Sequence, residues 1–355
     1  MPFSHLLIPH ALVDDAEAAP AARAALQAVF KNGGASSRAG GRWLPSLQGL
    51  LDRAPLQTRR LDANGVTSAH EAMLAQALGL DPLVPPWAAL RAHALRLPEA
   101  DTAAWAFMTP AHWVLPQGVG QSQVRLSDPD QLRLDEAEAQ ALCAAMQAYF
   151  AEDGLSLHID RPGLWLVRGD ALRGLRSPAP ERVLALGGDV APWLPTASPA
   201  APLLRRLQNE MQMLLYTHPV NDAREARGLP SVNSFWLHGG GKLAAVPTPQ
   251  ITWTVLDSLV APALQGYALG DWRAWAEAWR ALDAQLALTL TEPTGPQDAQ
   301  PRTTQAPTQL VLCGLHMLAT SDSTEPSSNG FWRRLRQRIR PGLQNEALAE
   351  LLVPA

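Results

Sequence analysis

The sequence is poor in cysteine and in charged residues. Its 355 residues include two cysteines, Cys143 in an expected helix and Cys313 in an expected strand. Their number and spacing suit neither a disulfide framework nor a zinc cluster, so we interpret both as small core residues. Charged residues make up 17% of the chain and hydrophobic residues 47%. The charged share is below the roughly 25% of an average globular protein, yet the hydrophobic share excludes wholesale disorder.

The sequence also lacks a long apolar run and an excess of basic residues. No window approaches the ~20 apolar residues of a membrane span. Residues 1–5 lack the basic region and apolar stretch of a signal peptide, so we expect a cytoplasmic protein without membrane association. The formal net charge of -4 provides no general attraction to nucleic acid, and nucleic-acid binding is not expected.

The common catalytic and cofactor-binding motifs are absent as well. The chain has no G-x-S-x-G elbow, Walker loop or G-x-G-x-x-G fingerprint, so hydrolase, nucleoside triphosphatase and dinucleotide functions lose their usual support. Its nine histidines form no H-E-x-x-H or H-x-H pattern, and the sequence therefore predicts no metal site and no cofactor. A metal site would need distant residues, among which the candidates are His5, His10, Asp14, His218, His238 and His316.

Alternating strand and helix patterns predict an α/β fold. An apolar strand at residues 5–8 precedes an alanine-rich helix at residues 16–30, and Ser68 with Glu71 forms a capping-box pattern before another helix. The glycine-rich residues 31–42 are interpreted as a flexible loop, although they could also cradle an anion. An α+β unit follows, with strands predicted at residues 105–108, 123–126, 155–159 and 164–168 and a helix at residues 134–150.

The proline-rich residues 191–202 indicate a domain boundary, because proline resists both helix and sheet interiors. An amphipathic helix is predicted at residues 203–216, a short helix capped by Asn221 at residues 222–227, and a strand at residues 232–238. The remaining predictions are strands at residues 250–255 and 309–313 and a helix at residues 271–290, whose Trp272, Trp275 and Trp279 are expected to lie in the core.

The densest group of hydrogen-bonding residues lies between residues 218 and 241. Consecutive glycines let backbone N–H groups approach a ligand, and Arg224 could clamp a phosphate or carboxylate with its planar guanidinium. The candidate ligand-binding residues are His218, Asn221, Arg224, Glu225, Asn233, Trp236, His238, Gly239, Gly240 and Gly241. The alternative is that the glycines allow a tight turn and that the polar side chains satisfy buried backbone groups.

A second feature is a run of arginines near the carboxyl end, formed by Arg333, Arg334, Arg336, Arg338 and Arg340. Five cations within eight residues could dock an acidic protein partner or nucleic acid, or they could form a solvated amphipathic face.

Several motifs resemble a proteobacterial family, the RpfE-type regulatory proteins, which is labelled cofactor-independent phosphoglycerate mutase-like. The motifs are L-Q-N-E-M-Q-M-L-L at residues 207–215, H-P-V-N at 218–221, R-E at 224–225 and N-S-F-W-L-H-G-G-G at 233–241. The resemblance implies a distant relation to alkaline-phosphatase-like enzymes. It also implies an α/β core domain of residues 1–98 and 191–355, with an inserted α+β domain at residues 99–190.

The chain departs from the two-metal mutases where they bind their ions. In the mutases a carboxylate residue follows the first strand, whereas here Pro9-His10-Ala11 follow it. No histidine stands beside Asp322. We therefore expect a non-catalytic regulatory or interaction protein, a pseudoenzyme on the mutase-like scaffold, that binds a small phosphorylated or carboxylate ligand or a protein partner. The alternative is a metal-dependent phosphoryl-transfer enzyme that uses manganese or zinc and acts as a phosphomutase or phosphatase.

Overall fold

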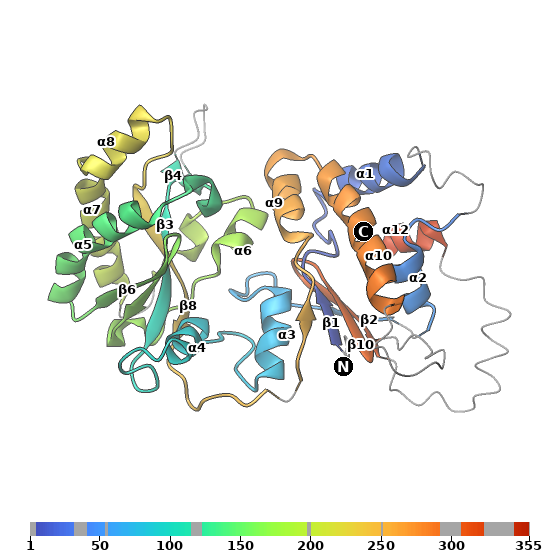
Figure 1. The fold of residues 1–355 in the computed structure, drawn as a ribbon, viewed down its shortest axis with the longest axis horizontal. Coiled ribbons are helices and arrows are strands. Elements are labelled where there is room, and N and C mark those ends of the chain that lie inside the picture. Colours follow the sequence, from blue (N-terminus) through green and yellow to red (C-terminus); the bar gives the residue numbers. More distant parts are fainter. Residues whose placement is uncertain are drawn as a thin grey trace, which may run out of the picture. The chain divides into compact units, whose positions relative to one another are not determined.

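The computed structural model describes residues 5–31, 41–53, 56–114, 123–196, 200–249, 251–291, 307–322 and 344–354. These residues form an α/β fold, as predicted, which divides into two compact units (Figure 1). Unit 1 comprises Met1–Ala63 and Gln250–Ala355, and unit 2 comprises Asn64–Pro249. Unit 2 is therefore one continuous segment, whereas unit 1 is assembled from both ends of the chain.

Unit 1 is built on a mixed sheet with the strand order β2-β11-β10-β1-β9. Its strands are β1 (His5–Ile8), β2 (Leu56–Arg60), β9 (Thr254–Val255), β10 (Gln309–Cys313) and β11 (Met317–Asp322). Strand β1 is parallel to β10 and β9, whereas β11 is antiparallel to β10 and β2. The predicted bounds of β1 and β10 are confirmed. The strand predicted at residues 250–255 is reduced to β9.

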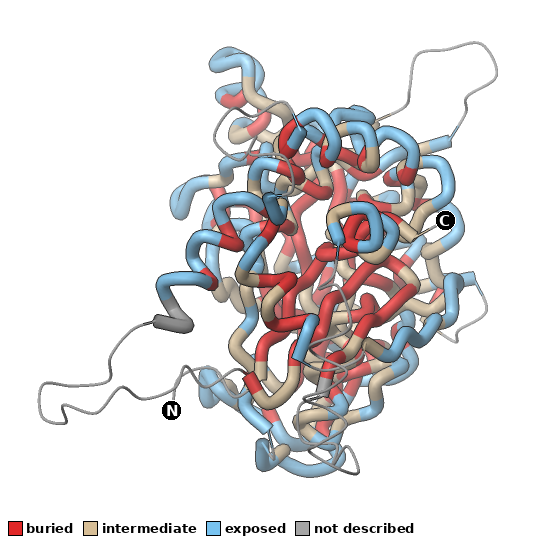
Figure 2. The backbone as a smooth tube through the Cα atoms, turned by 90° about the vertical axis from the view of Figure 1, so that its right-hand side faces the viewer, coloured by how far each residue is buried: buried red, intermediate tan, exposed pale blue. Residues whose placement is uncertain are grey.

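The helices of unit 1 are α1 (Ala19–Lys31), α2 (Pro45–Leu51), α9 (Val260–Leu269), α10 (Arg273–Thr291) and α12 (Asn345–Leu352). Trp272, Trp275 and Trp279 recur at spacings of three and four residues, so they share one face and lie in the core as predicted. Successive rings meet edge to face, with centroids 5.8 and 6.4 Å apart. Figure 2 shows helical turns that alternate between buried and exposed residues, as expected where one helix face packs inward.

Unit 2 is built on an antiparallel sheet with the order β6-β7-β3-β8. Its strands are β3 (Trp105–Ala111), β6 (Ser156–Arg161), β7 (Leu164–Arg168) and β8 (Ser234–Gly241), beside a small hairpin of β4 (Trp113–Val114) and β5 (Arg125–Leu126). Its helices are α3 (Ala69–Ala77), α4 (Trp87–Ala94), α5 (Glu136–Glu152), α6 (Pro180–Ala185), α7 (Ala201–Tyr216) and α8 (Pro219–Ala226). No helix in the described part of the chain is long and apolar enough to cross a membrane.

The alternation of side chains along β3 separates two apolar clusters of unit 2. Ala106 and Met108 pack in one cluster, whereas Trp105 and Phe107, which alternate with them, pack in the other, because successive strand residues point to opposite faces. The first cluster contains buried residues of α5 and α7, namely Leu142, Met146, Phe150, Leu204, Leu207, Met211 and Leu215. The second contains Ala88, Ala89 and Ala92 of α4. Both faces of this sheet are therefore covered.

The boundaries of the compact units differ from the predicted domain boundaries. The sequence placed an inserted domain at residues 99–190, whereas unit 2 spans Asn64–Pro249. The reason is strand pairing: β8 lies next to β3 along most of its length, from the pair Ala111 and Ser234 to the pair Trp105 and Gly241. Residues beyond 190 thus complete the sheet that residues before 190 begin. The described residues of the proline-rich stretch, 191–196 and 200–202, belong to unit 2.

A buried carboxylate of unit 1 generates a stability prediction. Asp283 of α10 accepts hydrogen bonds from the backbone N–H groups of Ser46 (3.2 Å) and Leu47 (2.7 Å) at the start of α2. We expect Asp283→Ala to lower the free energy of unfolding by about 1–3 kcal/mol, because two donors lose their partner. Glu277→Ala, on an exposed part of the same helix, should cost less than about 0.5 kcal/mol. Urea unfolding of both variants checks this, and equal losses would contradict it.

Candidate functional site

The cluster predicted at residues 218–241 begins at the junction of α7 and α8. His218 is the N-cap of α8, and its Nδ1 accepts a hydrogen bond from the backbone N–H of Val220 at 3.3 Å. Pro219 occupies the first helical position, where its missing N–H needs no partner. The sequence assigned the cap to Asn221, so the helix begins earlier than predicted. Glu225 is exposed on the same helix.

Asn221 has a different role: its side chain fixes the position of the residues that lead into β8. Its side chain is buried, and its Nδ2 donates to the carbonyl oxygens of Leu215 at 2.8 Å and Val232 at 2.7 Å. Its Oδ1 accepts from the backbone N–H of Val232 at 2.8 Å. Three bonds to backbone groups make Asn221 a tie between the end of α7 and the segment that leads into β8.

Arg224 is fully buried and its guanidinium points into the protein. Its Nε donates to the carbonyl of Pro230 (2.8 Å), one Nη to Glu138 (2.6 Å) and the other to the carbonyl of Leu132. Glu138 also accepts from the half-exposed Arg227 and forms the capping box at the start of α5. The sequence proposed Arg224 as an open anion clamp, but all three of its nitrogens are engaged within the protein. It acts as an internal tie between α8 and α5.

Two further candidates also bind backbone groups. Asn233 accepts from the N–H of Trp113 at 2.7 Å and donates to the carbonyl of the same residue at 2.8 Å. The indole N–H of Trp236, which is buried, donates to the carbonyl of Pro178 at 2.8 Å. These contacts anchor β8 to the hairpin of β4 and β5 and to the segment before α6.

His238 lies on β8 beside two residues of β3. Its Nε2 is 3.2 Å from the hydroxyl of Thr109, and its ring centroid is 5.3 Å from that of Phe107. Burial lowers the pKa of His238 from 6.5 to about 3, because desolvation penalises the charged imidazolium. His238 therefore remains neutral at physiological pH.

The three glycines at the end of β8 allow close packing. An added Cβ at Gly240 would lie 2.8 Å from the Cβ of Leu175, which no real side chain tolerates. Gly239 has φ +58°, a left-handed conformation that favours glycine, and lies against Phe107 and Trp87. The glycines thus bring the chain before α6 directly against the end of β8.

A cavity of about 510 Å³ opens in unit 2 where β8 ends. Gly240 and Gly241 line it, while Asn233, Trp236 and the residues from His218 to Glu225 do not. The lining comes from three segments: the connection between α3 and α4, the residues before α6, and the residues after β8. Its members are Leu78, Gly79, Leu80, Asp81, Val84, Pro86, Arg173, Gly174, Leu175, Arg176, Gly240, Gly241, Lys242, Ala244, Ala245, Val246 and Pro247.

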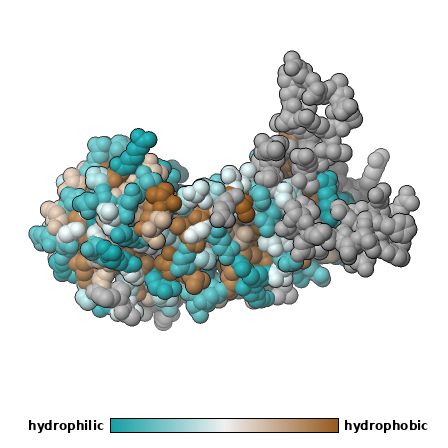
Figure 3. Space-filling model, turned by 90° about the horizontal axis from the view of Figure 1, so that it is seen from below, coloured by the Kyte–Doolittle hydropathy of each residue, from teal (hydrophilic) through white to brown (hydrophobic). Residues whose placement is uncertain are grey.

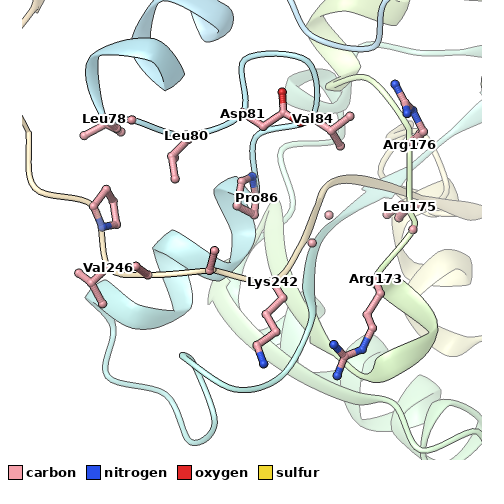
Figure 4. Close-up of a pocket in the computed structure, with 17 residues that line it drawn as sticks. Leu78, Leu80, Asp81, Val84, Pro86, Arg173, Leu175, Arg176, Lys242 and Val246 are labelled. Carbon is pink, nitrogen blue, oxygen red and sulfur yellow. The ribbon is translucent and has the colours of Figure 1, made fainter.

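The charged groups of this cavity are mainly cationic. Its lining includes three cationic residues, Arg173, Arg176 and Lys242, and one carboxylate, that of Asp81. Arg173 is paired with Asp170 through its Nε and one Nη, so its other Nη remains available to a ligand. Arg176 and Lys242 form no ion pair with any described residue. Figure 4 shows the side chains of Lys242 and Arg173 extending in the same direction. Sequence reasoning missed all three cations, although Lys242 directly follows the glycines.

The residues that the sequence offered as candidate metal ligands do not come together in the structure: one closes a turn, and the others are divided between the two units. Both carboxylate oxygens of Asp14 accept hydrogen bonds, from the backbone N–H groups of Leu315 and His316 at 2.7 Å each, and so close the turn between β10 and β11. His10 belongs to unit 1 with Asp14, whereas His218 and His238 belong to unit 2. Among the residues that the structure describes, no group of three or more His, Cys, Asp or Glu side chains could hold a metal ion. The side chain of Asp322 and the arginines between residues 333 and 340 lie outside the described residues.

Comparisons with known proteins give distant likenesses. No protein-family model and no curated protein matches the chain. Among solved structures, it is similar to the PH0037 protein from Pyrococcus horikoshii, at 12% identity and a TM-score of 0.41, over 91% of this chain and 88% of that one. It is also similar to a cofactor-independent phosphoglycerate mutase from Thermoplasma acidophilum DSM 1728, at 14% identity and a TM-score of 0.30, over 92% of both chains. TM-scores this low carry no argument about function, so the site is interpreted from its own geometry.

The buried hydrogen bonds of Arg224 lead to a stability prediction with a matched control variant. Arg224→Ala leaves Glu138 with one exposed partner and removes the donors to two carbonyl groups, so we expect the free energy of unfolding to fall by about 3–5 kcal/mol. Arg227→Ala removes the half-exposed partner of the same carboxylate and should cost less than about 1 kcal/mol. Urea unfolding checks both values. A loss below about 1 kcal/mol for Arg224→Ala would show that its buried bonds contribute little.

The depressed pKa of His238 predicts a pH-dependent stability. Between pH 6.5 and about pH 3 the unfolded chain binds a proton at this residue that the folded chain does not, so the stability contributed by His238 falls as the pH falls through this window. The slope from one such group is at most about 1.4 kcal/mol per pH unit. His238→Gln should remove this component when urea unfolding is measured from pH 4 to pH 7. Parallel curves for the two proteins would contradict the prediction.

Proposed function

We propose that the chain is a non-catalytic regulatory or interaction protein whose unit 2 binds a small phosphate- or carboxylate-bearing ligand in the cavity beside Gly240 and Gly241. The observation that carries this proposal is that Arg173, Arg176 and Lys242 line one cavity, with the side chains of Arg173 and Lys242 extending in the same direction. Three cations and one carboxylate at a common surface produce a positive local potential in a chain of net charge -4.

The chemistry of the lining supports an anion in particular. Arginine offers a planar fork of donors that matches carboxylate and phosphate oxygens, and lysine adds a compact charge. Gly240 and Gly241 lack side chains that would obstruct a ligand at the cavity wall. The volume of about 510 Å³ also falls within the roughly 300–1,000 Å³ typical of small-molecule sites.

The regulatory role and the scaffold rest on sequence resemblance. The motifs at residues 207–241 resemble the RpfE-type regulatory proteins, and on this ground we propose a phosphoglycerate mutase-like scaffold of the alkaline-phosphatase-like class. The arginines between residues 333 and 340 are proposed to dock a protein partner. The competing proposal is a metal-dependent phosphoryl-transfer enzyme, which would bind manganese or zinc.

The anion proposal is tested with inorganic phosphate as the probe. Lys31 and Lys242 are the lysines of the chain, so reductive methylation with a ¹³C label gives two lysine signals, of which Lys242→Arg identifies one. Phosphate should shift the Lys242 signal and leave that of Lys31 unchanged. Calorimetry should show an affinity about tenfold weaker for Lys242→Gln and for Arg173→Gln, since each removes a charge-assisted hydrogen bond worth about 1.5 kcal/mol.

The control is Arg205→Gln, which removes an exposed cation of α7 in the same unit, outside the cavity, and should leave phosphate binding unchanged. If all three variants lost phosphate affinity equally, the binding would depend on the overall charge of the protein, and a defined site would be contradicted. The enzyme alternative is separated by metal analysis and by mutase and phosphatase assays in manganese or zinc. A bound equivalent of metal together with turnover would replace the non-catalytic proposal.

A further inference from the structure

The cavity of unit 2 has an apolar wall in addition to its cationic residues. Leu78, Leu80 and Val84 come from the connection between α3 and α4, and Val246 and Pro247 come from the residues after β8. Figure 4 shows Leu78, Leu80 and Val246 on one side of the view and Arg173 and Arg176 on the other. One end of the cavity, at Leu78, Leu80 and Val246, is therefore apolar, whereas the other end holds cations beside the apolar Leu175 and Val84.

The apolar wall is accessible to solvent. Val246 is 49% exposed, and the side chains of Leu78 and Leu80 are partly buried. Figure 3 shows that hydrophobic residues reach the surface as patches between hydrophilic ones on the face in view. Single exposed apolar residues are common, but an apolar strip that continues into a cationic end within one cavity matches a ligand with two chemically different parts.

We infer that the ligand of this cavity is an amphipathic anion, whose charged head lies at Arg173 and Lys242 and whose aliphatic chain lies along Leu80 and Val246. This inference rests on the proposed anion-binding function and adds the second half of the ligand. A phosphate or a carboxylate satisfies the cationic end equally, so the head group is left to the experiment. The free molecule is favoured over the same group on a membrane lipid, because the wall lies in a cavity and the chain carries a net charge of -4.

The physical expectation is a dependence of affinity on chain length. Each methylene transferred from water to the apolar wall should raise the affinity roughly twofold to fourfold, until the wall is filled. An anion without a chain should bind through the cations alone. A neutral alcohol of the same length should bind more weakly than the anion, because it gains nothing from Arg173 and Lys242.

The experiment compares inorganic phosphate, acetate, hexanoate, octanoate, octyl phosphate and octanol on the full chain, by calorimetry and by the ¹³C-methyl signal of Lys242. We expect the affinity to rise from acetate to octanoate, and octyl phosphate to bind more tightly than inorganic phosphate. Val246→Ser and Leu80→Ala should flatten the dependence on chain length while leaving inorganic phosphate binding unchanged. The matched control is Leu83→Ser, which alters a 65% exposed leucine of the same connection outside the cavity and should change nothing.

The outcomes separate this inference from the function on which it rests. If phosphate binds and the carboxylate series shows no gain with length, the amphipathic ligand is overturned and the anion site stands. If neither phosphate nor octanoate binds, the proposed function fails together with the inference. Octanol that binds as tightly as octanoate would overturn recognition of the charged head. Cosedimentation with anionic phospholipid vesicles, without binding of free octanoate or octyl phosphate, would overturn the free ligand in favour of a membrane surface.

Discussion

The buried ion pair between Arg224 and Glu138 is the interaction on which the arrangement of unit 2 depends. A guanidinium without solvent contact must be compensated by a carboxylate and by further acceptors, and here Glu138 and the carbonyls of Leu132 and Pro230 supply them. These acceptors come from Leu132, before α5, from Glu138 in the first turn of α5 and from Pro230, after α8. The requirement to satisfy one charge therefore fixes where the chain turns toward β8, and with it the position of the whole strand beside β3.

The second constraint acts at the other end of β8. Gly240 packs against Leu175 so closely that no side chain fits between them. This contact joins two parts of the chain that carry cations on either side of it, Arg173 and Arg176 around Leu175 and Lys242 after the glycines. The cavity thus receives its positive charge as a consequence of backbone packing, and the glycine run is explained by the packing whether or not a ligand touches it.

The local patterns of the sequence predicted more of the fold than of the site. The bounds of β1 and β10, the buried tryptophan face of α10 and the apolar stripe of α7 follow from periodicity, because each is determined by neighbouring residues. The partner of Arg224 is Glu138, which stands 86 residues away in the sequence. No local pattern reports that pairing. The unit boundary differed for the same reason, since the pairing of β8 with β3 is a long-range property.

The polar cluster that first marked residues 218–241 as a site and the cations that line the cavity have different physical roles. Asn221, Arg224, Asn233 and Trp236 direct their hydrogen bonds to protein groups, so their donors are already used in the folded chain. Binding a ligand with them would first break buried bonds, and the loss would offset the gain. Arg176 and Lys242 have no such bonds to break among the described residues. A ligand that met them would break no buried hydrogen bond, which is why we propose the cavity, rather than the denser cluster, as the binding site.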